Sequence, residues 1–212
     1  MYGKVLSRKI IELQKNGLTS KCNVFTILTK KKIMKKVDVG DKSFVLKYSH
    51  NKLMRRISAM AEEINSLEKD KDIVFMIVLN GAYMFASDLT KKITLPCEVT
   101  FVKVASYSGT KSTGNLKTLV GINTELKNKT IILIEDIVDS GNTLENFIPQ
   151  LELHSPKEIK ICSLFFKPNS YKGKRQINYI GFSIDDSFIV GYGLDYNEKG
   201  RNLPAIYELE DQ

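Results

Sequence analysis

The apolar and polar positions of this chain of 212 residues form two kinds of pattern. Continuous apolar runs at 73–79 and 131–134 are typical of strands that are covered on both faces. Segment 51–70 instead carries apolar residues three or four positions apart, which indicates one buried face of a helix. The pattern therefore predicts a sheet that lies between helices.

The rest of the chain repeats these two patterns in alternation. Further strands are predicted at 98–105, 119–122, 158–166, 179–182 and 188–192, further helices at 83–92 and 145–153, and a short hairpin at 37–48. The last two strands are expected to form a C-terminal pair, and Gly40 and Asp41 to form the turn of the hairpin. Alternating strands and helices predict an α/β fold with a mostly parallel central sheet flanked by helices.

Polar groups follow several of the predicted strands at the point where each strand ends. Asn80 and Gly81 follow one strand, and Lys167 follows another. A polar stretch at 106–117 without apolar periodicity predicts a long mobile loop, and such loops in compact domains are commonly functional. Because ligands bind outside the carboxyl ends of parallel strands, these groups are expected to converge on one site.

The stretch at 130–144, TIILIEDIVDSGNTL, combines a buried strand with groups suited to an anion. The strand runs into Glu135 and Asp136, and Asp139 precedes a Ser-Gly-Asn-Thr turn that leads into helical spacing. Free backbone N–H groups at a helix start, together with the positive helix end, bind phosphate. Carboxylates beside a phosphate site repel it unless the ligand also presents hydroxyls and bound metal ions. A phosphorylated ribose with Mg²⁺ meets both conditions.

The net charge of +8 is concentrated at the start of the chain. Residues 1–33 contain eight lysines and arginines and one acid, which leaves the other 179 of the 212 residues near +1. We interpret 1–33 as a basic appendage with little fixed structure, and 34–212 as one domain with a core of ordinary size. A stretch upstream of the natural reading start is the favoured explanation for 1–33; a transit peptide and a nucleic-acid-binding tail are the alternatives.

The composition excludes several classes of protein. The apolar runs reach about seven residues, far below the roughly 20 that span a membrane. Three scattered cysteines and two histidines lack metal-ligand spacing, which predicts reduced thiols and no histidine-rich metal site. We therefore expect a cytoplasmic protein whose domain has neither a membrane nor a nucleic acid as its partner.

The sequence IILIEDIVDSGNT at 131–143 resembles the ribose-5-phosphate loop of type I phosphoribosyltransferases. Asp139, in the fifth position of EDIVD, is similar to the hypoxanthine/guanine branch, because adenine and orotate relatives usually carry a small or hydroxyl residue there. Three more segments agree in order: LNGAYMFASDL at 79–89, VASYSGTKSTGNLK at 104–117, and the run from Lys167 to Arg201 that ends VGYGLDYNEKGR. The resemblance covers roughly residues 37–209.

The resemblance implies a fold, a reaction and partners. The fold is that of type I phosphoribosyltransferases, with a small hood formed by N- and C-terminal segments. The implied activity is that of a glycosyltransferase of purine salvage, which moves 5-phosphoribosyl from phosphoribosyl pyrophosphate to N9 of hypoxanthine or guanine. The products are IMP or GMP and pyrophosphate, the cofactor is Mg²⁺, and family members commonly form homodimers or homotetramers.

The family pattern places the sugar and the 5′-phosphate on the stretch at 130–144. Glu135 and Asp136 would hold the ribose hydroxyls, directly or through a Mg²⁺ ion; acids that merely end a strand are the alternative. The 5′-phosphate would be wrapped by backbone N–H groups and hydroxyls of five residues: Asp139, Ser140, Gly141, Asn142 and Thr143. Gly141 fits because the backbone must approach the phosphate closely, and Ser140 as a helix N-cap is expected to be compatible with this role.

The family pattern assigns the purine to Asp139 and to residues further along the chain. Asp139 would act as general base or acid at purine N7, and Lys167 would donate to the 6-oxo group, which rejects adenine. An ordinary solvated lysine is the alternative for Lys167. Phe188 would stack on the ring and Ile189 would present its carbonyl to the 2-position, although residues of these types in a strand are usually core.

The pyrophosphate would be bound by two segments far apart in the chain. Asn80 and Gly81 would bind it through their backbone, with a cis peptide bond at this turn, and Arg201 would bind it through its planar guanidinium fork. Asp195, beside the purine, would ligate a Mg²⁺ on the pyrophosphate side.

The mobile loop would protect the reaction from water. The anomeric carbon passes through an oxocarbenium-like state that water would trap. Ser106 and Tyr107 would cover the pyrophosphate and the reacting centre when the loop closes.

Two positions depart from the family pattern, and two other functions stay open. Asn80 stands where relatives often carry Lys or Arg, and Asn142 stands where some carry Lys; a weaker hold on pyrophosphate is expected if the cation at position 80 matters. One alternative function is an enzyme that prefers xanthine or guanine. The other is a non-enzymatic, purine-sensing nucleic-acid regulator of the same fold with 1–33 as its arm, against which the near-neutral charge of the remaining chain argues.

Overall fold

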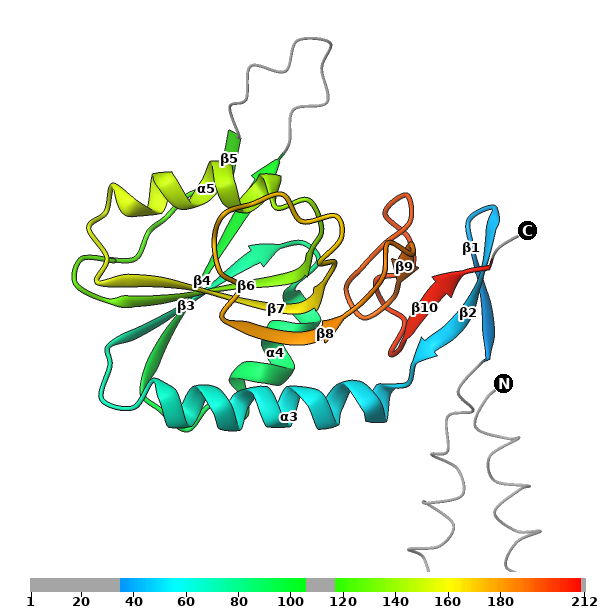
Figure 1. Ribbon diagram of the computed structural model, residues 1–212, viewed down its shortest axis with the longest axis horizontal. Helices are drawn as coiled ribbons and strands as arrows, with labels where there is room; N and C mark the ends of the chain where they lie inside the picture. Colours follow the sequence, from blue (N-terminus) through cyan, green and yellow to red (C-terminus); the bar gives the residue numbers. More distant parts are fainter. Residues whose placement is uncertain (1–34, 106–116, 211–212) are drawn as a thin grey trace, which may run out of the picture. The chain divides into compact units, whose positions relative to one another are not determined.

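Six strands form the central sheet of the protein, in the order β5-β4-β3-β6-β7-β8. The computed structural model describes residues 35–105 and 117–210 (Figure 1). The strands of this sheet are β3 (Ile73–Leu79), β4 (Cys97–Ala105), β5 (Lys117–Val120), β6 (Thr130–Val138), β7 (Glu158–Phe166) and β8 (Tyr179–Ser183). All neighbouring pairs are parallel except β4 and β5, which are antiparallel. The prediction of a mostly parallel α/β sheet is confirmed.

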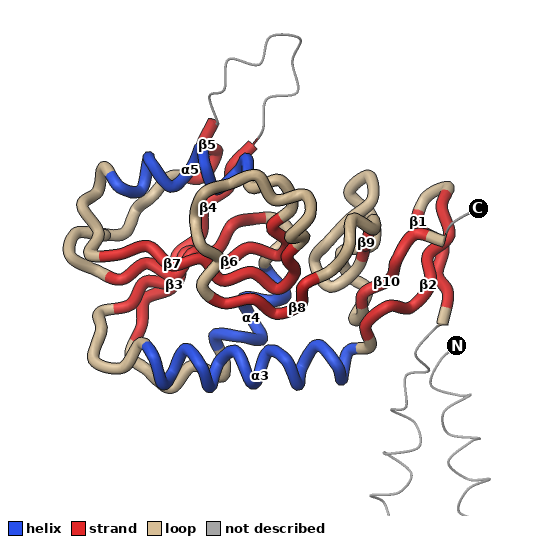
Figure 2. The backbone as a smooth tube through the Cα atoms, viewed as in Figure 1, coloured by secondary structure: helices blue, strands red, loops and turns tan. Residues whose placement is uncertain are grey.

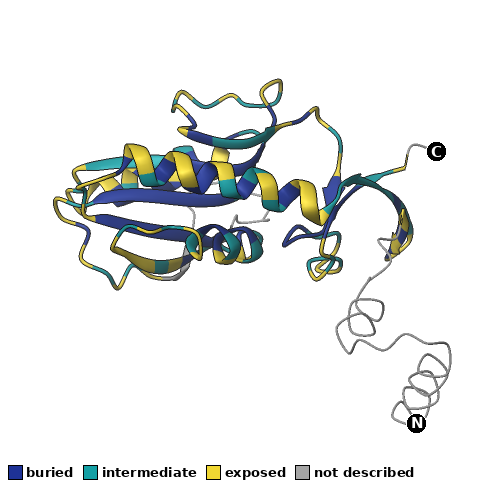
Figure 3. Ribbon diagram, turned by 90° about the horizontal axis from the view of Figure 1, so that it is seen from below, coloured by how far each residue is buried: buried dark blue, intermediate teal, exposed yellow. Residues whose placement is uncertain are grey.

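Three helices cover the two faces of this sheet (Figure 1). Helices α3 (His50–Leu67) and α4 (Tyr83–Thr90) pack on one face, and α5 (Asn142–Glu152) packs on the other. The side chains of β3 alternate between the two clusters: Ile73, Phe75 and Ile77 belong to the α3–α4 side, and Val74, Met76 and Val78 to the α5 side. A strand between two helical layers must be apolar at every position, which explains the continuous run at 73–79. Figure 3 shows strands of the protein as largely buried, whereas its helices alternate between buried and exposed positions.

Helix α3 follows its sequence signals closely. The Ser49 hydroxyl accepts a hydrogen bond from the backbone N–H of Lys52 at 3.4 Å and caps the helix start. The predicted apolar face is buried against the sheet: Leu53, Ile57, Met60, Ala61 and Ile64. On another side of the helix, the Arg56 guanidinium donates to the backbone carbonyls of Ile180 at 2.5 Å and Gly181 at 2.8 Å. The helix is thereby joined to the edge strand β8.

A buried acid, Glu68, lies at the end of the sheet where the parallel strands begin. Its carboxylate forms ion pairs with Lys71 at 3.0 Å and with Lys160 at 2.5 Å, and the Tyr179 hydroxyl donates to it. Lys71 also pairs with Glu158 at 2.7 Å. This charge network joins the end of α3 to β7 and β8.

A second, smaller sheet is antiparallel and has the order β1-β2-β10-β9. Its strands are β1 (Lys36–Val39), β2 (Lys42–Tyr48), β9 (Ile189–Val190) and β10 (Ile206–Leu209), and Figure 2 shows them as a group separate from the central sheet. The predicted hairpin is confirmed, with Gly40 at a φ of 64° in its turn. Both ends of the described chain therefore contribute to this sheet, as expected for the hood.

The predicted C-terminal strand pair is wrong. β8 pairs with β7 in the central sheet, whereas β9 has only two residues and pairs with β10 in the small sheet. The prediction missed β10, because a four-residue strand that pairs with residues about 160 positions away carries no local signal. β6 also runs on to Val138, so Glu135 and Asp136 lie within the strand and not after it.

Some predictions fall outside the described residues. The appendage at 1–33 and nearly all of the loop at 106–117 lie there, with Ser106 and Tyr107. The strand predicted at 119–122 is observed as β5, two residues earlier. No helix within 35–105 and 117–210 combines the length and the apolar character needed to cross a membrane.

Candidate active site

The loops that follow β3 and β6 meet the segment at 191–201 at the carboxyl end of the central sheet. Gly81, in the turn after β3, lies between the other two: a Cβ at this position would lie 1.6 Å from the Asp136 carboxylate. From the other side, a Cβ at Gly193 would lie 2.0 Å from the Gly81 carbonyl oxygen. The peptide bond between Leu79 and Asn80 is cis, at the turn where the sequence predicts one. The predicted pyrophosphate turn therefore touches the predicted sugar acids directly.

Glu135 and Asp136 are held in the last part of β6. Glu135 is 6% exposed, and no described residue forms an ion pair or a hydrogen bond with its carboxylate. The Asp136 carboxylate accepts a hydrogen bond from the Ile137 backbone N–H at 2.9 Å. Burial, and then the charge of Asp136, raises the pKa of Glu135 well above its usual range. Burial also raises the pKa of Asp136, although its backbone hydrogen bonds and Arg201 oppose the shift.

These two carboxylates suit a divalent cation that arrives with the substrate. Mg²⁺ takes oxygen ligands and is usually bound by one or two carboxylates together with substrate phosphates. The described residues include no cluster of three or more side chains that would hold a metal unaided. Glu135 is buried and Asp136 is half-buried, and no described lysine or arginine forms an ion pair with either. Because Asp136 also contacts the turn at Gly81, the two acids fit a shared metal better than a protein-only metal site.

The segment after β6 forms a small cradle of ≈100 Å³, lined by residues 135 and 137–144. Gly141 lies in the left-handed region, with a φ of 85°, and is the N-cap of α5. The sequence suggested Ser140 as the N-cap, which is wrong. The Ser140 hydroxyl instead accepts a hydrogen bond from the Asn142 backbone N–H at 3.4 Å. The positive φ of Gly141 turns the chain sharply, so the first backbone N–H groups of α5 point into the cradle.

Asp139 and Lys167 form an ion pair at the mouth of this cradle. The Lys167 ammonium donates to the Asp139 carboxylate at 2.8 Å, and the Lys167 backbone N–H bonds to the Val138 carbonyl at 3.0 Å. The side chain of Lys167 is 10% exposed and that of Asp139 is 51% exposed. Lys167 is therefore not an ordinary solvated lysine.

Phe188 and Ile189 divide between the surface and the core. Ile189 is buried in β9, while Phe188 is 44% exposed and packs edge-on against Tyr196, with ring centroids 5.9 Å apart. Phe188 lines a hollow of ≈710 Å³ together with residues 185–187 and 208–210, a group that includes neither Asp139 nor Lys167. The segment that carries Phe188 nevertheless approaches the segment that carries Lys167, because the Ser170 hydroxyl donates to the Asp186 carboxylate at 2.5 Å.

Arg201 and Asp195 are joined within the segment at 191–201. The Arg201 guanidinium pairs with Asp195 at 2.7 Å and with Glu198 at 3.1 Å, and it donates to the Gly193 carbonyl at 3.0 Å. The Asp195 carboxylate also accepts from the Glu198 N–H at 2.8 Å. Asp195, the predicted metal ligand, and Arg201, the predicted pyrophosphate ligand, are therefore held together by an ion pair.

Sequence reasoning missed two tyrosines that support the site. The Tyr171 ring fills the space behind Gly141, where a Cβ would lie 2.4 Å from it. The Tyr192 hydroxyl donates to the Asp88 carboxylate on α4 at 2.5 Å. Neither tyrosine has a local signal of this role, although Tyr192 stands between two glycines, a pattern that indicates an unusual backbone.

Comparisons with known proteins agree with this geometry. The profile of the family described as "Phosphoribosyl transferase domain" matches residues 48–197. The hypoxanthine-guanine-xanthine phosphoribosyltransferase of Tritrichomonas foetus is 35% identical over 165 residues, which cover 77% of this chain and 90% of that protein. The hypoxanthine phosphoribosyltransferase of Escherichia coli strain K12 is 38% identical over 154 residues, covering 71% and 86%. The crystal structure of a hypoxanthine phosphoribosyltransferase from Staphylococcus aureus matches with a TM-score of 0.74 at 33% identity, covering 78% of this chain and 90% of that one.

Proposed function

Since the chain belongs to the phosphoribosyl transferase family, we propose that it transfers the 5-phosphoribosyl group of phosphoribosyl pyrophosphate to N9 of hypoxanthine and guanine. The products are IMP or GMP and pyrophosphate, which makes the protein an enzyme of purine salvage. The observation that carries the proposal is the Asp139–Lys167 pair at the mouth of the phosphate cradle. A purine beside this pair would meet one acid and one cationic donor.

The sugar and its phosphate are bound by β6 and the cradle. Glu135 and Asp136 hold the ribose hydroxyls, and the backbone N–H groups of 139–143, with the hydroxyls of Ser140 and Thr143, hold the 5′-phosphate. The cradle carries no lysine or arginine of its own, so its attraction for phosphate comes from the backbone and the positive end of α5. This arrangement fixes the ribose at one depth relative to the purine subsite.

The leaving pyrophosphate is bound by the turn after β3 and by Arg201. The backbone of Asn80 and Gly81 and the guanidinium of Arg201 bind its oxygens, while Asp195, Glu135 and Asp136 are the carboxylates that would hold Mg²⁺. When bound, Mg²⁺ neutralises the negative charge that develops on the leaving group. Ser106 and Tyr107 cover the reacting centre in this proposal and exclude water from it.

The choice of base is made by Lys167 and Asp139. Lys167 donates to the 6-oxo group, for which the 6-amino group of adenine cannot substitute, because it would leave the buried ammonium facing another donor. Asp139 exchanges its bond to Lys167 for a bond to purine N7 and takes or returns a proton there as charge moves through the ring. Phe188 stacks on the ring and the Ile189 carbonyl faces the 2-position, which requires the small sheet to approach the base.

The family relationship supports two further proposals. We propose that the protein is cytoplasmic, as expected for a salvage enzyme that uses a soluble phosphorylated donor. We also propose that it assembles as a homodimer or homotetramer. Size measurement in solution on the full chain tests the second point directly.

The direct test is a spectrophotometric assay with phosphoribosyl pyrophosphate, Mg²⁺ and each of hypoxanthine, guanine, xanthine and adenine. We expect turnover with the first two and little with adenine. The Tritrichomonas foetus relative has xanthine in its name, so comparable turnover of xanthine would widen the substrate class. Comparable turnover of adenine would contradict the role of Lys167.

Variants connect this assay to the residues. Asp139→Asn should lower kcat by roughly 10²- to 10⁴-fold, the usual contribution of a general acid or base. Asp70→Asn is the matched control, because Asp70 is exposed, lies away from the cradle and has a φ of 65° that asparagine adopts readily. Equal effects of the two substitutions would contradict the role of Asp139.

A further inference from the structure

The segment at 191–201 carries Asp195 and Arg201 but has little regular structure to hold it in place. Its first three residues, Gly191, Tyr192 and Gly193, all have positive φ, at 100°, 49° and 104°. Backbone hydrogen bonds fold the segment on itself: the Gly193 N–H donates to the Arg201 carbonyl at 2.9 Å, and the Tyr192 N–H to the Leu203 carbonyl at 2.8 Å. These bonds fix the shape of the segment but not its position on the central sheet.

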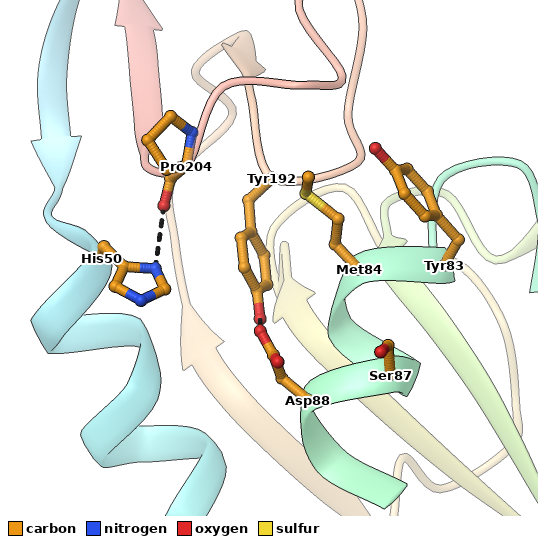
Figure 4. Close-up of a pocket in the computed structure, with 7 residues that line it drawn as sticks. All are labelled: His50, Tyr83, Met84, Ser87, Asp88, Tyr192 and Pro204. Carbon is orange, nitrogen blue, oxygen red and sulfur yellow. Dashed lines mark hydrogen bonds between the residues drawn. The ribbon is translucent and has the colours of Figure 1, made fainter. Parts of the chain in front are cut away.

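The side chain of Tyr192 connects this segment to α4. Figure 4 shows its ring pointing down toward the helix, with the hydroxyl directed at Asp88. The hydroxyl donates to the Asp88 carboxylate at 2.5 Å, and the residue is 3% exposed. Lys91 binds the other Asp88 oxygen at 2.6 Å, so the acceptor is held in place from its own helix.

The connection is made at the helix that directly follows the pyrophosphate turn. Helix α4 begins at Tyr83, two residues after Gly81, and Gly193 lies against the Gly81 carbonyl. The Tyr83 hydroxyl also lies 3.4 Å from the Arg201 carbonyl. The bond between Tyr192 and Asp88 therefore sets the distance between the Asn80–Gly81 turn on one side and Arg201 on the other.

A cavity lies beside Tyr192, so the position of its ring depends on the hydrogen bond to Asp88. The cavity measures ≈270 Å³ and is lined by His50, Tyr83, Met84, Ser87, Asp88, Tyr192 and Pro204 (Figure 4). Tyr192 is itself buried in the core cluster, but it borders this cavity, so its ring has a space into which it can shift if its hydroxyl is released. If the ring were closely packed on all sides, losing this hydrogen bond would leave the ring in place.

We propose that Tyr192 and Asp88 are positioning residues that hold the 191–201 segment against α4 in the arrangement that binds pyrophosphate. The proposal rests on the pyrophosphate-binding role given above to Asp195 and Arg201. Neither Tyr192 nor Asp88 contacts the substrate. Their effect is on the binding of the pyrophosphate group, while purine binding by Lys167 and Asp139 is independent of them.

The test compares two Tyr→Phe variants of the full chain. Tyr192→Phe removes the bond to Asp88, and Tyr179→Phe removes the bond that another tyrosine, also 3% exposed, donates to buried Glu68 at the opposite end of the sheet. Three constants are measured: the Kd for magnesium pyrophosphate by calorimetry, the KM for phosphoribosyl pyrophosphate, and the KM for hypoxanthine. We expect Tyr192→Phe to raise the first two constants by roughly ten-fold, the size of one hydrogen bond to a charged group, and the KM for hypoxanthine by less than about two-fold.

Tyr179→Phe should lower thermal stability and leave all three constants within about two-fold of the parent protein. Equal changes of the pyrophosphate constant in the two variants would overturn the proposal, because a general loss of stability would then explain both. An equal rise of the hypoxanthine KM in Tyr192→Phe would also overturn it.

Two more variants separate this inference from the function on which it rests. Asp88→Asn keeps a carbonyl acceptor for the tyrosine and should weaken pyrophosphate binding less than Asp88→Ala, which should match Tyr192→Phe and add nothing to it in the double variant. Arg201→Lys tests the pyrophosphate role itself. A large effect of Arg201→Lys with no effect of Tyr192→Phe rejects the positioning pair alone, and no effect of Arg201→Lys rejects the proposed pyrophosphate site.

Discussion

The two ends of the central sheet treat their buried acids in opposite ways. At the end where the parallel strands begin, Glu68 is fully buried but is bound by two lysines and a tyrosine. At the end where they finish, Glu135 is buried and the adjacent Asp136 is half-buried, and no described lysine or arginine forms an ion pair with either. Both ends thus contain carboxylates out of water, but only one end neutralises them within the chain.

The pKa values of these acids move in opposite directions. Burial alone would raise the pKa of Glu68, but the hydrogen bonds from Lys160 and Tyr179 outweigh it and lower the pKa. Burial raises the pKa of Glu135 and of Asp136, and their mutual proximity adds to the shift at Glu135. The first arrangement stabilises the fold. The second costs stability, and in the proposed function a cation and a ligand would offset that cost.

The largest expected effect comes from removing the charges of Glu135 and Asp136 at the carboxyl end of the parallel strands. A Glu135→Gln, Asp136→Asn double variant should lose roughly 10²- to 10³-fold in kcat/KM, because it removes the groups aimed at the sugar and its metal. Its free energy of unfolding should rise by about 1–2 kcal/mol at pH 7, since no buried like-charge pair remains. Chemical denaturation and the standard assay measure the two quantities. A variant that is both inactive and less stable would remove the contrast between the two ends.

The next largest effect comes from removing the charge of Glu68, at the end of the sheet where the parallel strands begin. Glu68→Gln should lower the free energy of unfolding by about 2–3 kcal/mol, because Lys71 and Lys160 lose a buried partner but keep some solvent contact. Its kcat/KM, measured at a temperature where the protein is folded, should stay within about two-fold of the parent value. Glu98→Gln is the control, since it removes an ion pair of an exposed acid with Lys129 and should cost less than about 1 kcal/mol.

The dependence of stability on pH sharpens the comparison further. Because the folded pKa of Glu68 is lowered, its stabilisation is fully present above the unfolded pKa of about 4.3 and is lost as pH falls through the folded value. The difference in unfolding free energy between the parent protein and Glu68→Gln should therefore shrink below about pH 4. Denaturation curves between pH 3 and 7 measure it. A difference that stays constant down to pH 3 would show that Glu68 is not stabilised as an anion.

The smallest expected effect concerns Asn80, a predicted pyrophosphate contact at a position where relatives often carry a cation. Asn80→Lys places an ammonium in the turn beside the unpaired acids, where relatives often carry Lys or Arg. We expect the KM for phosphoribosyl pyrophosphate to fall by roughly two- to five-fold, the effect of one partly exposed charge pair. The Lys92→Asn variant, at an exposed position just after α4, tests whether a change of one charge nearby has the same effect. Weaker binding in Asn80→Lys would mean that the turn acts through its backbone alone.

The central sheet and the course of the loop at 139–143 could be predicted from the sequence because their signals are local. The run at 73–79 is observed as β3 with the same bounds, and the acids and the Ser-Gly-Asn-Thr turn lie in one continuous segment. Glu68 gave no such signal, since its partner Lys160 is 92 positions away. Tyr192 and Asp88 are 104 positions apart, and their contact depends on how the 191–201 segment folds back onto α4. Contacts of this kind are decided by tertiary packing, which periodicity does not report.

The ring of Tyr171 behind Gly141 has a consequence for how a phosphate is bound. The ring occupies the space into which the loop at 139–143 would otherwise relax, and its own hydroxyl is fixed to the Arg175 carbonyl at 2.8 Å. The donor groups of the cradle are therefore preorganised in the free protein, so the loop loses little conformational entropy when the ligand arrives. If the cradle binds the 5′-phosphate as proposed, we expect this binding to be driven by enthalpy, because the loop already has its bound shape in the folded chain.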